Sequence, residues 1–172
     1  MGADKMTSIH NPTVGIDPGL SGAIAIYRPD EPPILMDMPT CARLSGKGLQ
    51  LDLAALSGIL GGYLGATVFL EQVGAMPGNG ATSMFAFGRS VGQIEGILGA
   101  LQMPVRYLSP RSWKKTLGLI GKDKDAARTL AIQRFPLAAG DLNRKKDCGR
   151  ADALLMAYVG WGLLTAEGRI AA

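Results

Sequence analysis

Cysteine, histidine and long apolar runs are scarce in this 172-residue sequence. Its two cysteines, Cys41 and Cys148, match no zinc-binding or redox spacing, so we expect free thiols in a cytoplasmic or organelle-internal protein that is not secreted. No apolar run approaches the ~20 residues of a membrane-spanning helix. The segment 1–12 lacks the apolar stretch of a secretory signal and is expected to be a flexible tail, which contains the single histidine, His10.

Charged residues are also few, at 19% of the chain, while hydrophobic residues make up 47%. This balance excludes a disordered polypeptide and predicts one folded domain over residues 13–167. The net charge is +4, and lysine and arginine gather in the stretches 106–128 and 144–150. Such clusters are either ordinary solvated faces or a surface for a polyanion such as nucleic acid, and charge alone leaves both alternatives open.

Hydrophobic periodicity and turn residues predict an α/β fold. Strands are expected at 13–17, 22–27, 34–38, 66–71 and 105–108, and helices from about residue 52 and at 83–101, 110–115, 122–135 and 148–167. The stretches 40–50 and 136–147 are predicted to be loops. The first three strands are expected to pair antiparallel, and the later alternation of helices and strands predicts a mixed five-stranded sheet flanked by helices.

Three acidic residues stand where a functional carboxylate is plausible. Asp17 ends the first predicted strand, Glu71 ends the fourth, and Asp152 lies one turn into the apolar final helix. If the first and fourth strands are neighbours, Asp17 and Glu71 project from adjacent strand ends, and a helix packed across the sheet brings Asp152 to them. Carboxylates gathered in this way need a compensating cation, and Mg²⁺ and Mn²⁺ prefer such oxygen ligands.

Each acid also has a structural interpretation. Asp17 begins Asp-Pro-Gly, a common turn sequence that is also compatible with a phosphate-binding loop. Glu71 is equally consistent with a solvent-facing strand end, and Asp147 is suited to cap the final helix. Asp152 is the hardest to explain structurally, because an isolated acid in an apolar helix is costly without a partner.

Four stretches together resemble one protein family. GIDPGLSGAIAIY (15–27), VFLEQVGAMPGNG (68–80) and DCGRADALLMAY (147–158) look like the motifs of RuvC-type Holliday junction resolvases, which belong to the ribonuclease H-like superfamily. PRSWKKTLGLIGKDKDAARTLAIQRFP (110–136) is more similar to the chloroplast and phage branch than to the standard bacterial enzyme. The resemblance covers about residues 13–160.

The resemblance implies a ribonuclease H-like fold and a metal-dependent endonuclease. Such an enzyme works as a homodimer on four-way DNA junctions and makes paired symmetric nicks. It implies catalytic metal ligands at Asp17, Glu71 and Asp152, which would hold two Mg²⁺ or Mn²⁺ ions. The standard bacterial pattern has a fourth ligand at the position of Gly149, whereas the chloroplast-like branch implies Asp147, which is therefore the expected fourth ligand here.

DNA contacts fit the basic clusters and the glycine-rich loop after residue 71. The expected DNA-binding residues are Met76, Lys114, Lys115, Lys122, Lys124, Arg128, Lys145, Lys146 and Arg150. Met76 is suited to act as an apolar wedge between base steps, although its loop is equally consistent with a flexible connector. Trp113 is expected either to stack on a base or to anchor the core. The glycine-rich helix 83–101 is the expected dimer surface.

Three other functions compete with this interpretation. Another ribonuclease H-like nuclease, acting on flaps, branched DNA or RNA–DNA hybrids, would share the acidic motifs. A sugar kinase or actin-like ATPase shares the first motif but needs two related domains and a second phosphate loop. A non-catalytic DNA-binding module has no reason to retain the acids. The resemblance predicts a bacterial or phage-encoded, nucleoid-associated protein or an organelle-internal one, with no membrane or small-molecule cofactor.

Overall fold

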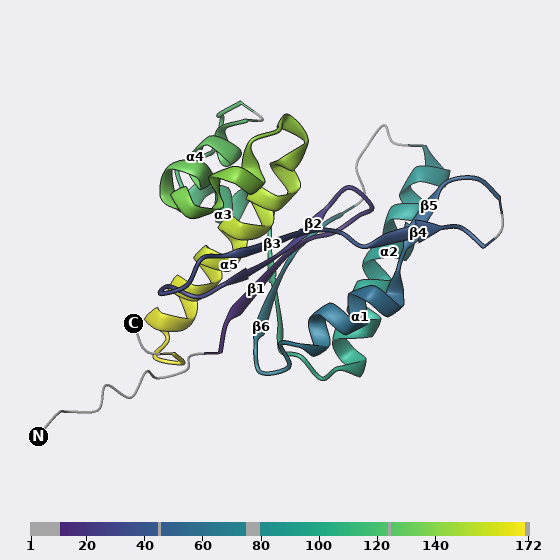
Figure 1. The fold of residues 1–172 in the computed structure, drawn as a ribbon, viewed down its shortest axis with the longest axis horizontal. Helices are drawn as coiled ribbons and strands as arrows, with labels where there is room; N and C mark the ends of the chain where they lie inside the picture. Colours follow the sequence, from purple (N-terminus) through teal and green to yellow (C-terminus); the bar gives the residue numbers. More distant parts are fainter. Residues whose placement is uncertain (1–10, 45, 75–79, 124, 171–172) are drawn as a thin grey trace, which may run out of the picture.

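A mixed five-stranded sheet forms the centre of the computed structural model, which describes residues 11–44, 46–74, 80–123 and 125–170 (Figure 1). The strand order is β3-β2-β1-β6-β7. These strands are β1 (Thr13–Asp17), β2 (Ala23–Tyr27), β3 (Ile34–Asp37), β6 (Thr67–Glu71) and β7 (Val105–Leu108). β1, β2 and β3 pair antiparallel, whereas β6 is parallel to β1 and β7 is parallel to β6. The predicted sheet is therefore confirmed, and its first and fourth strands are neighbours.

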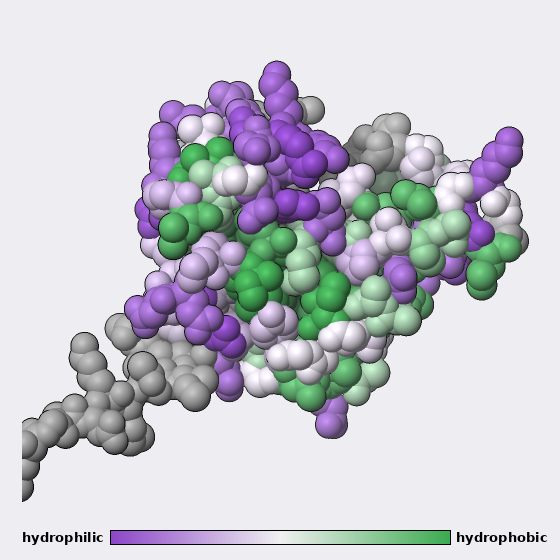
Figure 2. All heavy atoms as spheres, in the orientation of Figure 1, coloured by the Kyte–Doolittle hydropathy of each residue, from purple (hydrophilic) through white to green (hydrophobic). Residues whose placement is uncertain are grey.

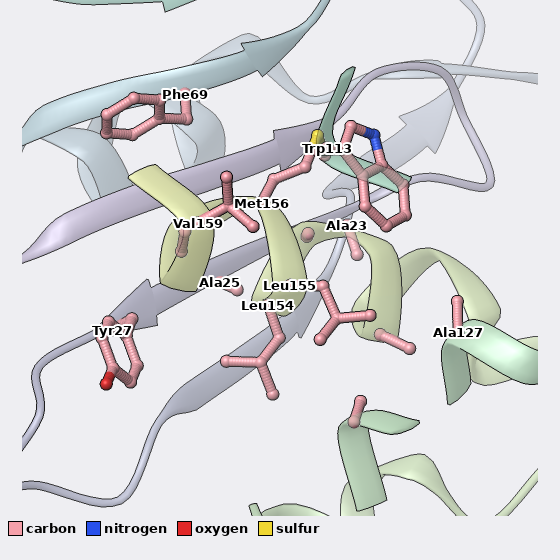
Figure 3. Packing of buried hydrophobic residues seen from close by; sticks show 14 of the residues in the cluster. Ala23, Ala25, Tyr27, Phe69, Trp113, Ala127, Leu154, Leu155, Met156 and Val159 are labelled. Atoms are coloured by element: carbon pink, nitrogen blue, oxygen red, sulfur yellow. The ribbon is translucent and has the colours of Figure 1, made fainter. Parts of the chain in front are cut away.

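Helices cover both faces of this sheet (Figure 1). One face carries α1 (Leu53–Gly61) and α2 (Ala81–Ala100), and the other carries α3 (Pro110–Thr116), α4 (Ala126–Arg134) and α5 (Cys148–Ala166). Because strand side chains alternate between faces, the sheet separates two cores. Val14 and Ile16 pack toward α1 and α2, whereas Ala25 and Phe69 pack toward α5. Figure 3 shows the second core, with Phe69 and Trp113 on opposite sides of Met156.

Two segments predicted to be loops are ordered into regular structure. Within residues 40–50, β4 (Thr40–Ala42) and β5 (Leu49–Leu51) form a separate antiparallel hairpin. Positive φ angles at Gly46 (86°) and Gly48 (104°) let the chain reverse, and the burial of Leu51 in the α1 and α2 core anchors the hairpin.

The second segment, 136–147, forms two 3₁₀ helices, η1 (Pro136–Leu142) and η2 (Lys145–Asp147). It is ordered because Ala138 and Leu142 are buried against α5 and α4. Within the described parts of the chain, no helix has both the length and the apolar character needed to cross a bilayer. Most of the predicted N-terminal tail, at 1–10, lies outside the described residues.

Candidate active site

Asp17 and Glu71 end neighbouring parallel strands at the same edge of the sheet. The β1–β6 register pairs Ile16 with Leu70, and each acid is the next residue along its strand. Ile16 and Leu70 face the α1 and α2 core, so the alternation of side chains directs both acids to the face that α5 covers. This is the arrangement expected if the first and fourth predicted strands are neighbours.

α5 lies unusually close to the sheet because glycines stand at its points of contact. A Cβ atom on Gly15 of β1 would lie 1.9 Å from the backbone oxygen of Ala153, and one on Gly160 of α5 would lie 2.2 Å from the ring of Phe69. The helix backbone therefore rests directly on β1 and β6. This close approach carries Asp152, one residue before Ala153, to the ends of the two strands.

Gly149 lies one turn before Asp152 and touches the site itself. A Cβ atom added to Gly149 would be 3.0 Å from Asp17 Oδ2 and 3.1 Å from the carbonyl oxygen of Ser21. A larger residue would have to displace the Asp17 carboxylate or the β1–β2 turn. The position that carries a ligand in the standard bacterial pattern is therefore packed against the first acid here.

The three acids share one electrostatic environment with Lys114. Burial, followed by the negative charges of Glu71 and Asp152, raises the pKa of Asp17 to about 8, against the opposing charge of Lys114. Burial also raises the pKa of Asp152 to about 6, which Lys114 lowers and Glu71 raises. Negative charge at this edge of the sheet is therefore only partly compensated by the protein.

Trp113 of α3 holds one of the acids by a hydrogen bond. Its indole Nε1 donates to Glu71 Oε1 over 3.0 Å, and the side chain is completely buried. Of the two roles considered for Trp113, the structure supports the core anchor and leaves no exposed ring for a base to stack on. No local pattern indicates its polar contact with Glu71, which lies 42 residues earlier.

Asp147, the expected fourth ligand, is bound to Arg144 in this structure. Asp147 Oδ2 accepts a hydrogen bond from the backbone N–H of Arg144 (2.8 Å), and Oδ1 accepts one from the Arg144 guanidinium (2.7 Å). These contacts with Arg144 lower the pKa of Asp147, whose side chain is only 1% exposed. Arg144 therefore engages both carboxylate oxygens in this structure, which favours a structural role, and the metal-ligand role of Asp147 stays a prediction.

The remaining acids suit a hard divalent cation. Asp17, Glu71 and Asp152 offer only carboxylate oxygens, the ligands that Mg²⁺ and Mn²⁺ prefer. Among the described residues, no three acidic, histidine or cysteine side chains are already gathered tightly enough to hold a metal ion. The cluster is thus open. Burial first, and neighbouring negative charge second, raise the pKa of Asp17, and a bound cation would favour its ionised form against both.

The predicted DNA-binding residues separate into distinct groups. Arg128 is bound to Asp125 (2.7 Å) and Arg150 to Asp37 (2.6 Å), and both arginine side chains are largely buried, so in this structure they stabilise the fold. The lysines that remain exposed are Lys115, Lys122, Lys145 and Lys146. Hydrophilic residues gather over the α3 and α4 side of the molecule (Figure 2). Met76 and Lys124 lie outside the described residues.

The glycines of α2 lie on its solvent side and do not pack against the sheet. A Cβ atom added to any of them would meet nothing within 4 Å; they are Gly88, Gly92, Gly96 and Gly99. The residues of α2 that face the sheet are instead Ser90, Ile94 and Leu98. The glycines therefore do not serve close packing against the sheet, and their role at the expected dimer surface stays a prediction.

Comparison with known proteins supports the resemblance seen in the motifs. No protein-family model matches the chain. Over 96 residues, which are 55% of this chain, the sequence is 38% identical to a Chlamydomonas reinhardtii protein described as "Holliday junction resolvase MOC1, chloroplastic". The match covers 11% of that relative, so this chain corresponds to a small part of its length.

Two solved structures share the fold. The structure of T. thermophilus RuvC in complex with Holliday junction substrate has a TM-score of 0.53 and 14% identity, and the match covers 89% of this chain and 97% of that one. The Thermus thermophilus RuvC structure has a TM-score of 0.52 and 15% identity, and the match covers 88% of this chain and 96% of that one. The RuvC-like, ribonuclease H-like fold predicted from the sequence is thereby confirmed. At this identity the likeness concerns the fold alone.

Proposed function

We propose that this protein is a divalent-metal-dependent endonuclease that resolves four-way DNA junctions by paired symmetric nicks. The observation that carries the proposal is that Asp17 and Glu71 end neighbouring strands at one edge of the sheet, with Asp152 of α5 near enough for its charge to raise the pKa of Asp17. The resolvase description of the relative and the RuvC fold support the choice of substrate. A junction is also the substrate implied by the four sequence motifs.

Asp17, Glu71 and Asp152 would hold two Mg²⁺ or Mn²⁺ ions, which when bound activate a water molecule and stabilise the departing 3′ oxygen. The protein's own groups prepare this site. The hydrogen bond from Trp113 orients the Glu71 carboxylate, and the buried surroundings of Asp17 strengthen its attraction for a cation. Lys114 supplies a positive charge at the same edge, where the scissile phosphate would lie.

The exposed lysines around the site would bind the phosphate backbone. Lys115 and Lys122 lie on and after α3, while Lys145 and Lys146 lie on η2, directly before α5. Contacts of this kind provide affinity with little sequence information and weaken as the salt concentration rises. Met76 and Lys124 stay in the proposed DNA-binding set on sequence grounds.

The proposal includes a homodimer, because two symmetric nicks in a four-way junction require two active sites related by a two-fold axis. The exposed glycine face of α2 is the proposed contact between the subunits, since the absence of side chains lets two helix backbones approach closely. Light scattering of the purified protein measures this directly. A monomer at all concentrations would contradict it.

The decisive experiment compares substrates side by side. With Mg²⁺ or Mn²⁺, the purified protein is expected to cut a synthetic four-way junction by symmetric nicks, and to leave a linear duplex of the same sequence intact. Asp17→Asn is expected to abolish cutting without abolishing binding. Preferred cutting of a flap or an RNA–DNA hybrid would favour another ribonuclease H-like nuclease, and full activity in Asp17→Asn would exclude the proposed site.

A further inference from the structure

The β4–β5 hairpin starts beside the proposed active site. A Cβ atom on Gly22 would lie 2.0 Å from the backbone oxygen of Asp17, and the carbonyl oxygen of Gly22 accepts a hydrogen bond from the backbone N–H of Met38 (2.9 Å). Met38 is two residues before β4. The backbone N–H of Asp52, directly after β5, donates to the carbonyl oxygen of Pro39 (2.9 Å) and closes the hairpin at its base. The hairpin is therefore fixed to the turn that follows the first acid.

The β4–β5 hairpin forms a sheet of its own, apart from the five-stranded sheet. Figure 1 shows it on one side of the β1–β2 turn, with α3 and α4 on the other side. The exposed lysines of the proposed DNA surface belong to that other side, where they lie on and after α3 and on η2. A DNA strand with a phosphate at Asp17 would therefore lie between the lysines and the hairpin.

The charge of the hairpin is entirely positive. Residues 38–51 include two charged residues, Arg43 and Lys47, and no acidic residue. Both are exposed. Arg43 Nε donates a hydrogen bond to the carbonyl oxygen of Leu49 (3.0 Å), which holds this arginine on the hairpin and does not involve its two terminal amino groups. The hairpin is therefore complementary in charge to a phosphate backbone.

An apolar residue lies between these two charges in the sequence. Leu44 is 98% exposed, which is the largest exposure of any large apolar side chain among the described residues. Proteins that bind the DNA minor groove combine arginine or lysine with apolar side chains that insert between base steps. Reading of the major groove relies instead on hydrogen bonds from polar side chains, which a leucine does not make. The hairpin therefore suits the minor groove.

The length of the hairpin limits which part of the DNA it meets. Leu44 is six residues after Met38, and six residues of chain span at most about 22 Å. One turn of duplex DNA is about 34 Å long. Because Met38 is joined through Gly22 to the backbone of Asp17, Leu44 would meet a DNA arm within one turn of a phosphate bound at that acid.

We propose that the β4–β5 hairpin enters the minor groove of the junction arm that is cut. Leu44 packs against a base step in the groove, and Arg43 and Lys47 bind the phosphates that border it. The inference rests on the proposed function, because it needs a DNA strand at Asp17. It assigns an apolar contact with the arm to the hairpin, on the opposite side of the site from the exposed lysines.

The test of the groove is chemical footprinting of a four-way junction, in the Asp17→Asn background so that no cutting occurs. Hydroxyl radicals attack the sugars from the minor groove, whereas dimethyl sulfate methylates guanine N7 in the major groove. We expect protection from hydroxyl radicals within one turn of the cut, and loss of that protection when Leu44→Ser is added. Protection of guanine N7 there without protection from hydroxyl radicals would contradict the proposal.

Binding constants give a second measure that does not depend on footprinting. Leu44→Ser should weaken junction binding at least about fivefold, and Lys47→Gln should reduce the slope of log K against log salt concentration by about 1. The matched controls are Leu64→Ser, at a leucine that is 54% exposed, and Arg169→Gln, at an exposed arginine. Leu64 precedes the start of β6 and Arg169 follows the end of α5, so both lie away from the acids and should leave binding unchanged.

An exposed leucine is also suited to a contact between subunits, so light scattering is recorded for each variant. A dimer that becomes a monomer in Leu44→Ser would identify the hairpin as a subunit contact and overturn the proposal. If the unmodified protein binds no junction, the proposed function fails and this inference fails with it. A protein that binds and cuts junctions, while Leu44→Ser and Lys47→Gln behave like their controls, would refute only the hairpin contact.

Discussion

Trp113 and Glu71 are joined by a 3.0 Å hydrogen bond from the indole Nε1 to a carboxylate oxygen, which links the core to the proposed metal site. The next residue on α3, Lys114, has its Nζ 5.0 Å from the centre of the same indole ring. The charge of Lys114 acts on both Asp17 and Asp152. One turn of α3 therefore orients one acid and supplies positive charge to the other two.

We expect Trp113→Phe to raise the Mg²⁺ concentration needed for half-maximal junction cleavage by about tenfold or more. Phenylalanine keeps an aromatic ring in the core and removes the N–H donor, and a hydrogen bond to a charged group contributes about 1.5–3 kcal/mol. The measurement is cleavage rate against Mg²⁺ concentration. Trp161→Phe is the control, since Trp161 packs against Tyr27. Equal Mg²⁺ requirements in the two variants would show that the contact does not orient Glu71.

Gly15→Ala should destabilise the protein severely. The new Cβ atom would lie 1.9 Å from the backbone oxygen of Ala153, and neither backbone can yield without separating α5 from β1. We expect the free energy of unfolding to fall by about 3 kcal/mol or more, as measured by urea denaturation. Gly58→Ala in α1 is the matched control: its Cβ atom meets nothing within 4 Å, so it should gain up to about 1 kcal/mol. Equal stabilities of the two variants would refute the close approach of helix and strand.

Asp147 and Asp152 are expected to respond oppositely to replacement by asparagine. Asp147→Asn removes the charged contact with Arg144 and should lower the free energy of unfolding by about 1.5–3 kcal/mol, while metal-dependent cleavage persists. Asp152→Asn should abolish cleavage without loss of stability. Thermal melts and cleavage assays of both variants distinguish the roles. Abolished cleavage with an unchanged melt in Asp147→Asn would instead identify Asp147 as a ligand.

The parts of this structure that the sequence predicts are those set by local pattern. β1 and β6 are short β-branched and apolar runs, and each ends in an acid, so Asp17 and Glu71 could be placed at strand ends without coordinates. Asp152 was identified because an acid in an apolar helix needs a partner. A glycine within an apolar strand, as at Gly15, is also a sequence signal of close backbone approach.

The parts that could not be predicted depend on pairing between distant residues. Arg150 is bound to Asp37, 113 residues earlier, a contact that no local pattern indicates, and its role in DNA binding stays a prediction. Asp147 is bound by Arg144, which is only three residues earlier in the chain. The sequence does not distinguish an aspartate held in such an ion pair from one that binds a metal. The β4–β5 hairpin could not be predicted because its strands are only three residues long and its anchor, Leu51, lies in a core contributed mainly by other elements.

The stability of the metal-free protein should fall as the pH rises from about 4 to 8. The pKa of Asp17 is about 8 in the folded protein against an ordinary value of 3.8, and that of Asp152 is raised to about 6. In this window the unfolded chain has released protons that the folded protein still binds, so the free energy of unfolding decreases with pH and levels off above the folded pKa. Melting temperatures at pH 5 and pH 8 measure the effect.

Two comparisons connect this pH dependence with the site. Asp17→Asn removes the largest contribution, so at pH 8 it should melt roughly 5 °C or more above the unmodified protein, with a smaller difference at pH 5. Mg²⁺ should stabilise the unmodified protein at pH 8 more than at pH 5, because it binds the ionised carboxylates. Glu31→Gln, at an exposed acid paired with Arg28, is the control. It should change neither the difference in melting temperature between pH 5 and pH 8 nor the stabilisation by Mg²⁺. If Asp17→Asn melts at the same temperature as the unmodified protein at pH 8, Asp17 is not held in a buried acidic cluster.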